Sequence, residues 1–132
     1  MNANRTKAFA ICLSVLLVIG MAAKLLAHHS QSQFDVSKTI TLEGTLTAVS
    51  WSNPHSFFFL NGKPIDDKDA TMQRWAIEGP SPLGMERYGW TKETAKPGTK
   101  IIMAGNPRRD GKPDLLLLSI TLDGKKVTFK PE

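Results

Sequence analysis

Cysteine is almost absent from this 132-residue chain, in which Cys12 is the only one. Cys12 lies inside an apolar N-terminal run, so the rest of the sequence offers neither a disulfide nor a thiol. An oxidising compartment permits disulfides but does not require them. The stability of the remaining chain must therefore come from its hydrophobic core alone.

A strong excess of one charge is also missing. The 17 basic and 12 acidic residues give a formal charge of +5, but Arg5, Lys7 and Lys24 all belong to the N-terminal segment. Without them, 14 basic and 12 acidic side chains leave a net charge of +2, and the basic residues are scattered. Nucleic-acid binders concentrate their basic residues in a patch or stripe, so no nucleic-acid partner is expected.

The motifs of the common enzyme classes are absent. The sequence contains no G-x-S-x-G, no phosphate-binding loop and no zinc-protease motif. Asp66, Asp67 and Asp69 cluster in a polar segment but lack the spacing of an EF-hand, and we interpret them as solvated loop charge. No catalytic residue is therefore predicted, and an enzyme is expected only if a bound copper ion makes it one.

The one long apolar run, residues 8–23, is too short for an ordinary membrane span. As a helix, its 16 residues would reach about 24 Å, against a hydrocarbon core of about 30 Å. Arg5 and Lys7 precede the run, and a short stretch that ends in the small residue Ala27 follows it. A positive start, an apolar middle and a small residue before polar sequence are typical of a signal peptide. We predict that residues 1–27 are a signal peptide and that the protein is periplasmic or secreted. Cleavage after Ala23 and an uncleaved inner-membrane anchor facing the periplasm are the alternatives.

The remaining residues predict a small, mostly β domain. Residues 28–38 read as an extended N-terminal tail, and residues 39–132 as one domain with strands over 39–50, 55–60, 72–78, 100–105, 115–122 and 127–129. A bulge is expected at Val49–Trp51, where the apolar residues change parity. Asn61-Gly62 is interpreted as the start of a loop, and Asp123-Gly124 as a tight hairpin turn into the last strand. The predicted core comprises Leu42, Leu46, Trp75, Ile77, Ile101, Met103 and Leu116.

One short helix is expected between the third and fourth strands. Pro82 stands at its first position after Ser81 as the N-cap, and Gly89 is placed to end it. An order of three strands, a helix and further strands is that of an OB-fold, a small Greek-key barrel that binds ligands on one sheet face and at its end loops. The predicted fold class is therefore an OB-fold-like β-barrel of five to six strands.

Several segments also resemble a known family. They are AHHS, TLEGTLTAVSWSNPHSFFFL, W-x-I-E-G-P-S-P-L and YGWTKETAKPGTKIIMAGNPRRDGKPDLLLLSITLDGKK. Together they are similar to a family of small exported bacterial proteins of unknown function. The recurring sequence motifs of that family are W-x-NPH, RxGW, KPG and a terminal xDG. The resemblance implies one domain and a periplasmic location, and it implies no activity.

The three histidines of the chain form the most specific candidate site. If cleavage follows Ala27, His28 becomes the N-terminal residue, and its α-amine and ring can chelate Cu(II) together. His55 or His29 would supply a third nitrogen. Cleavage after Ala23 would remove this chelate, and the histidines would then be solvated tail and turn residues. Copper is preferred over zinc, which usually takes more protein ligands.

A second set of residues could form a ligand face without metal. Trp51, Asn53 and Phe57 lie around the predicted first turn, where an OB-fold binds its ligands. Most aromatic residues of so small a domain belong to its core, which is the alternative interpretation. The sequence thus leaves two functions open. One is a copper-binding periplasmic protein, and the other is a metal-free module that binds a small molecule, a peptide or an envelope protein.

Overall fold

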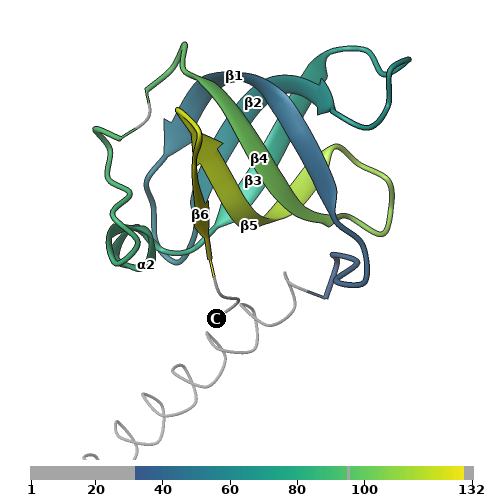
Figure 1. The fold of residues 1–132 in the computed structure, drawn as a ribbon. Helices are drawn as coiled ribbons and strands as arrows, with labels where there is room; N and C mark the ends of the chain where they lie inside the picture. The colour runs from purple at the N-terminus through teal and green to yellow at the C-terminus, as the bar shows by residue number, and fades with distance from the viewer. Residues whose placement is uncertain (1–31, 95, 130–132) are drawn as a thin grey trace, which may run out of the picture. The chain divides into compact units, whose positions relative to one another are not determined.

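The structure, a computed structural model, describes residues 32–94 and 96–129 (Figure 1). Six strands and one short helix follow each other along the chain: β1 Ile40–Ser50, β2 Ser56–Pro64, β3 Gln73–Gly79, α2 Pro82–Glu86, β4 Lys100–Pro107, β5 Asp114–Leu122 and β6 Lys125–Thr128. Within these described residues, no helix combines the length and apolar composition of a membrane span.

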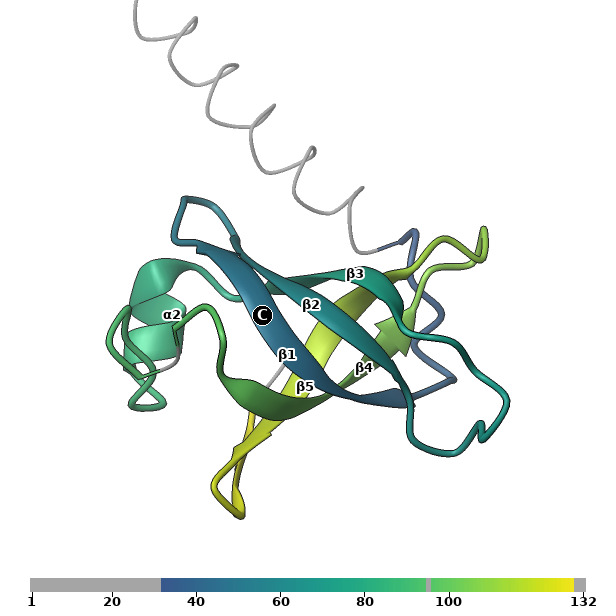
Figure 2. The same cartoon turned by 90° about the horizontal axis from the view of Figure 1, so that it is seen from above.

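The strands close into a five-stranded barrel to which β6 is added. Their order in the sheet is β3-β2-β1-β4-β5-β6, and β3 also pairs with β5 (Figures 1 and 2). This closing pair is parallel and joins Ala76–Glu78 to Asp114–Leu116, whereas the other pairs are antiparallel. This is the arrangement of an OB-fold, so the predicted fold class is confirmed.

The barrel interior contains six of the seven predicted core residues. Leu42, Leu46, Trp75, Ile77, Ile101 and Met103 are buried. The prediction of Leu116 is wrong, because Leu115 and Leu117 point inward and Leu116 is only half-buried. A register shift pairs Ala104 with Ser119 and Gly105 with Leu117, so Leu118 is skipped. The inward positions of β5 therefore change parity at Leu118, which the leucine run conceals.

The pairing of β1 with β2 differs from the prediction at two points. The register shift lies between Leu46 and Ala48, earlier than the bulge expected at Val49–Trp51. Strand β2 also continues through Asn61-Gly62, where a loop was expected. A Cβ on Gly44 would collide with the carbonyl oxygen of Asn61, and one on Gly62 would lie 2.6 Å from the carbonyl oxygen of Glu43. These glycines thus serve a close approach of two strands instead of a turn.

Local signals around the helix and the last hairpin are confirmed. The Ser81 hydroxyl accepts a hydrogen bond from the Gly84 backbone amide at 3.1 Å, as an N-cap does. Gly89 has a φ of 79° just after the helix, and Trp90 returns to the core. Asp123, with a φ of 50°, forms with Gly124 the tight turn from β5 into β6.

The residues just before β1 are fastened to the barrel. Phe34 is 4% exposed and forms an isolated antiparallel bridge with Arg108. The Asp35 amide donates to the Pro107 carbonyl at 2.8 Å, and the Asn106 side chain donates to the Lys38 carbonyl at 2.6 Å. The compact unit of the chain thus begins at Gln33, within the segment interpreted as a tail.

Candidate functional site

A histidine and a glutamate meet beside the turn between β1 and β2. The Nδ1 atom of His55 lies 2.6 Å from Oε1 of Glu78, and their side chains are 18% and 11% exposed. Glu78 is the last but one residue of β3, and its partner across the sheet is Phe57. The pairing of β2 with β3 therefore brings a turn residue and a strand end into one hydrogen-bonded pair.

The backbone around His55 is fixed by its neighbours. The Ser52 hydroxyl donates to the His55 carbonyl at 3.1 Å across a turn that contains the cis peptide bond between Asn53 and Pro54. On the other side, the Ser56 amide donates to the Pro80 carbonyl at 3.0 Å. With both flanks bonded, the imidazole of His55 is held against the end of β3.

A small cleft opens next to this pair on the outer face of β2, β3 and β5. Its volume is about 110 Å³, and its lining includes Phe34, Phe57, Glu78 and Arg108. Ligand pockets for drug-sized molecules measure about 300–1,000 Å³, so this cleft suits an ion or a very small group. The turns that flank it, β1–β2 and β4–β5, border the face on which OB-folds bind ligands.

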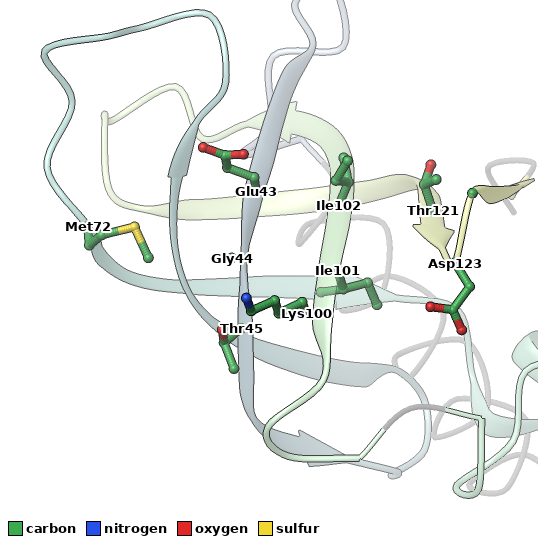
Figure 3. A pocket seen from close by; sticks show the side chains of 10 residues that line it. Glu43, Gly44, Thr45, Met72, Lys100, Ile101, Ile102, Thr121 and Asp123 are labelled. Atoms are coloured by element: carbon green, nitrogen blue, oxygen red, sulfur yellow. The ribbon is translucent and has the colours of Figure 1, made fainter.

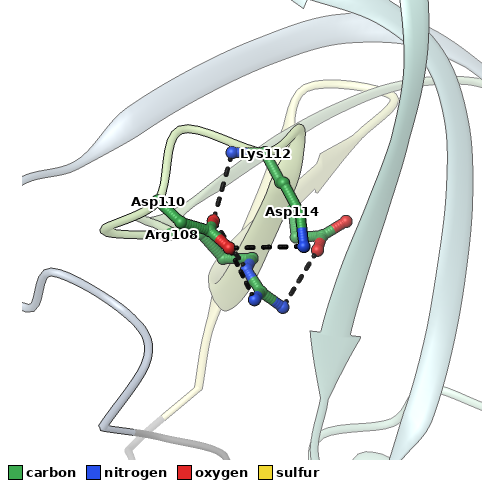
Figure 4. A network of polar contacts seen from close by, with 4 residues as sticks. All are labelled: Arg108, Asp110, Lys112 and Asp114. Atoms are coloured by element: carbon green, nitrogen blue, oxygen red, sulfur yellow. Dashed lines mark hydrogen bonds and ion pairs between the residues drawn. The ribbon is translucent and has the colours of Figure 1, made fainter.

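An ion-pair network holds the β4–β5 loop beside the cleft (Figure 4). Arg108 donates through Nε and Nη2 to the carboxylate of Asp110 at 2.9 and 2.8 Å, and its Nη1 lies 3.4 Å from Asp114. The hydrogen bond from Arg108 holds the pKa of Asp110 well below its ordinary value, and that bond also raises the pKa of Arg108. Because Asp110 and Asp114 already pair with this guanidinium, we interpret the role of Arg108 as holding the β4–β5 loop in place.

A larger groove lies elsewhere on the barrel (Figure 3). It measures about 470 Å³, and its surface is mostly apolar. Its lining includes Ile102 of β4, Met72 of the β2–β3 loop and Asp123 of the last hairpin. Ile102 and Met72 are 39% and 51% exposed, which is high for large apolar side chains. A groove of this size and composition can hold a small apolar molecule.

The predicted metal ligands are only partly within view. His55 lies in the pair described above, whereas His28 and His29 fall outside the described residues. In residues 32–94 and 96–129, no group of three or more histidine, cysteine or acidic side chains is arranged to hold a metal ion. The described residues thus contain one of the three predicted ligands, His55.

The three predicted ligand-face residues lie in different environments. Trp51 is half-buried, and its ring packs edge-to-face on Phe58 with centroids 6.1 Å apart. Asn53 is exposed in the β1–β2 turn. Phe57 alone lines the cleft beside Glu78.

Two residues of this region were missed at the sequence level. Glu78 was not predicted to belong to a site, and Arg74 of the same strand stacks on the ring of Phe59, 5.0 Å from its centroid. An acid at the end of an apolar strand was the only available signal for Glu78. Phe34 was assigned to a polar tail, and nothing near it in sequence indicates that it packs beside the β4–β5 loop.

The sequence matches the model of a known protein family. A family model matches residues 15–116, most of the chain. The chain belongs to the family of unknown function DUF6152. The resemblance to a family of unknown function is thus confirmed. No curated protein and no solved structure matches this DUF6152 chain, so its activity is inferred from the chemistry of its own side chains.

Proposed function

We propose that this protein is a periplasmic copper-binding protein in which His55 is one ligand and the N-terminal histidine supplies the others. In this proposal, cleavage after Ala27 makes His28 the first residue. Its α-amine and ring then form a chelate, and the imidazole of His55 completes a site with three nitrogen donors. His29 is the alternative third donor.

The observation that carries the proposal is the 2.6 Å contact between Nδ1 of His55 and Oε1 of Glu78. A carboxylate accepts hydrogen bonds, so a neutral imidazole in this contact places its proton on Nδ1 and leaves Nε2 available to a metal. Metal-binding histidines commonly donate their second ring nitrogen to a carboxylate, which fixes the ring orientation and strengthens the ligand. The contact with Glu78 therefore supports His55 as a ligand through Nε2.

Chain length is compatible with this donor set. Phe34 is fastened beside the cleft that Glu78 also lines. His28 precedes Phe34 by six residues, which span at most about 20 Å when extended. A segment of this length is compatible with a first residue that approaches the cleft lined by Glu78. A bound ion would also suit a cleft of about 110 Å³ better than an organic ligand would.

Copper binding to three matched proteins tests the proposal. The first begins at His28, the second carries one alanine before His28, and the third begins at His28 with His55→Gln. Because the extra alanine moves the amine away from the ring, it should weaken Cu(II) affinity strongly, and His55→Gln alone should also weaken it because one nitrogen donor is lost. Lys125→Ala, far from any histidine in sequence, is the control and should change nothing. Equal affinity of all these proteins in competition calorimetry refutes the proposal.

We propose a metal-free function as the second candidate, because of the groove in Figure 3. In that case the barrel binds a small apolar molecule over Ile102 and Met72, in a volume of about 470 Å³. A peptide or envelope protein with an apolar side chain at this position would use the same groove.

Fluorescence of 1-anilinonaphthalene-8-sulfonate in the presence of EDTA tests this second candidate. The dye should bind the unchanged protein, and Ile102→Glu should abolish the signal by placing a charge in the groove. Leu83→Glu is the matched control, since Leu83 is an apolar residue of α2 that is 61% exposed outside the groove. If Ile102→Glu leaves the signal unchanged, the groove is not the site.

A further inference from the structure

An exposed arginine on the outer face of β3 stacks on an aromatic ring. The guanidinium carbon of Arg74 lies over the ring of Phe59, 5.0 Å from its centroid. None of the ion pairs between described residues includes Arg74. Stacking uses the flat face of a guanidinium and leaves its N–H edges free to donate.

The stacked pair lies on a part of the sheet where the residues paired with Phe59 have small side chains. Phe59 is paired across the sheet with Ala48 on one side and Ala76 on the other. Arg74 is paired with Asn61, the next outward position of β2. Alanines therefore flank the phenylalanine on both neighbouring strands.

That space is a hollow of about 400 Å³, lined by Thr47, Ala48, Asn61 and Arg74. The hydroxyl of Thr47 donates to the Phe59 carbonyl at 3.1 Å, so it is held in place. Among the described residues that line the hollow, Arg74 is the only charged one. The hollow thus offers one cation with a free donor edge, one side-chain amide and an apolar floor.

A purely structural role explains less of this arrangement. Stacking alone would let the stem of Arg74 shield Phe59 from water. It gives no reason for an open hollow beside the guanidinium. Bidentate donation by arginine matches a pair of oxygen atoms on a carboxylate or a phosphate. The lining therefore complements a negative charge carried on a small apolar body.

We propose that the hollow beside Arg74 binds a small molecule that carries an oxyanion on a flat apolar body. The oxyanion accepts hydrogen bonds from the guanidinium of Arg74, and Asn61 supplies a further polar contact. The apolar body lies over Ala48. This site contains neither His55 nor Glu78, so it does not depend on copper.

Nuclear magnetic resonance titrations of ¹⁵N-labelled protein test the site, with EDTA present and with protein from cells expressing the complete chain. Benzoate and phenyl phosphate are the two oxyanion probes, and benzamide is the neutral probe of the same shape. We expect at least one oxyanion to shift the backbone signals of Thr47, Ala48 and Asn61. Benzamide should bind about tenfold more weakly, since it lacks the charge that strengthens hydrogen bonds from arginine.

Three variants separate recognition from packing. Arg74→Gln should weaken the oxyanion about tenfold or more, and Arg74→Lys should weaken it less because it keeps the charge and loses the fork. Arg87→Gln replaces an exposed arginine outside the hollow and should have no effect. Thermal unfolding of each variant establishes that it is folded. His55→Gln should bind the oxyanion normally, so this test stands or fails separately from the copper proposal.

The proposal is overturned by any of three results. The first is equal binding of benzoate, phenyl phosphate and benzamide. The second is an unchanged oxyanion affinity in folded Arg74→Gln. The third is a set of shifted signals that lies away from Thr47, Ala48 and Asn61. A loss of stability in Arg74→Gln without any oxyanion binding to the parent protein would assign Arg74 a packing role alone.

Discussion

The hydrogen bond between His55 and Glu78 should contribute measurably to folding. Both side chains are less than one fifth exposed and their atoms lie 2.6 Å apart, so solvent screens the interaction little. Hydrogen bonds to charged groups contribute about 1.5–3 kcal/mol. A double-mutant cycle of His55→Ala, Glu78→Ala and the double variant should therefore give a coupling free energy of about 1.5–3 kcal/mol. Other contacts of Glu78 cancel in such a cycle.

Urea unfolding followed by tryptophan fluorescence at pH 7, with EDTA present, measures the coupling. The pair of Glu43 and Lys63 provides a matched control, because its atoms are 4.0 Å apart and its side chains are 54% and 33% exposed. Exposed pairs of this kind contribute less than about 1 kcal/mol. If the coupling of His55 with Glu78 is no larger than that of the control, the pair does not hold the imidazole and the support for a ligand at His55 is lost.

Three further predictions concern the barrel and its loop. Ile77→Ala, at a fully buried position, should lower the free energy of unfolding by about 2–5 kcal/mol, whereas Leu83→Ala, at an exposed one, should change it by less than about 0.5 kcal/mol; equal effects in urea unfolding would contradict the core assignment. The Ser56 hydroxyl is buried and has no partner within the described part of the chain, so Ser56→Ala should be neutral or stabilising in thermal unfolding, and a clear loss would reveal a hidden partner. The pKa of Asp110 is lowered in the fold, so its pairing with Arg108 stabilises the loop above the ordinary carboxyl pKa of 3.8 and is lost as the pH falls below that value. The backbone amide signals of the loop should therefore shift below that pH, and Arg108→Gln should abolish the shift.

Features encoded by neighbouring residues could be predicted from the sequence. The alternation of Leu42 with polar residues identified a half-buried strand, Ser81 before Pro82 identified a helix start, and Asp123-Gly124 identified a hairpin. In each case the physical cause lies within a few residues. The order of these elements was then enough to predict the barrel.

Features that depend on contacts between distant segments could not be predicted. The skipped residue Leu118 depends on the register between β4 and β5, and a run of four leucines has no alternation to reveal it. Phe34 is buried only because the chain before β1 meets Arg108, more than seventy residues later. His55 and Glu78 likewise become neighbours only when β2 pairs with β3, and the sequence between them carries no signal of the contact.

The candidate copper site also combines features that are local in sequence with a contact between distant segments. The sequence alone indicated the three histidines and the consequence of cleavage before His28. The tertiary structure added the contact between Nδ1 of His55 and the carboxylate of Glu78, an arrangement that metal-binding histidines commonly have. Among the described residues, no group of three or more histidine, cysteine or acidic side chains is arranged to hold a metal ion.

Electron paramagnetic resonance of one equivalent of Cu(II) on protein that begins at His28 tests the copper proposal most directly. The proposal predicts a single bound copper with three nitrogen donors, reduced to two by His55→Gln and unchanged in number by Lys125→Ala. A spectrum that is the same with and without the imidazole of His55 contradicts the proposal, as does a copper signal identical to that of the free ion in buffer.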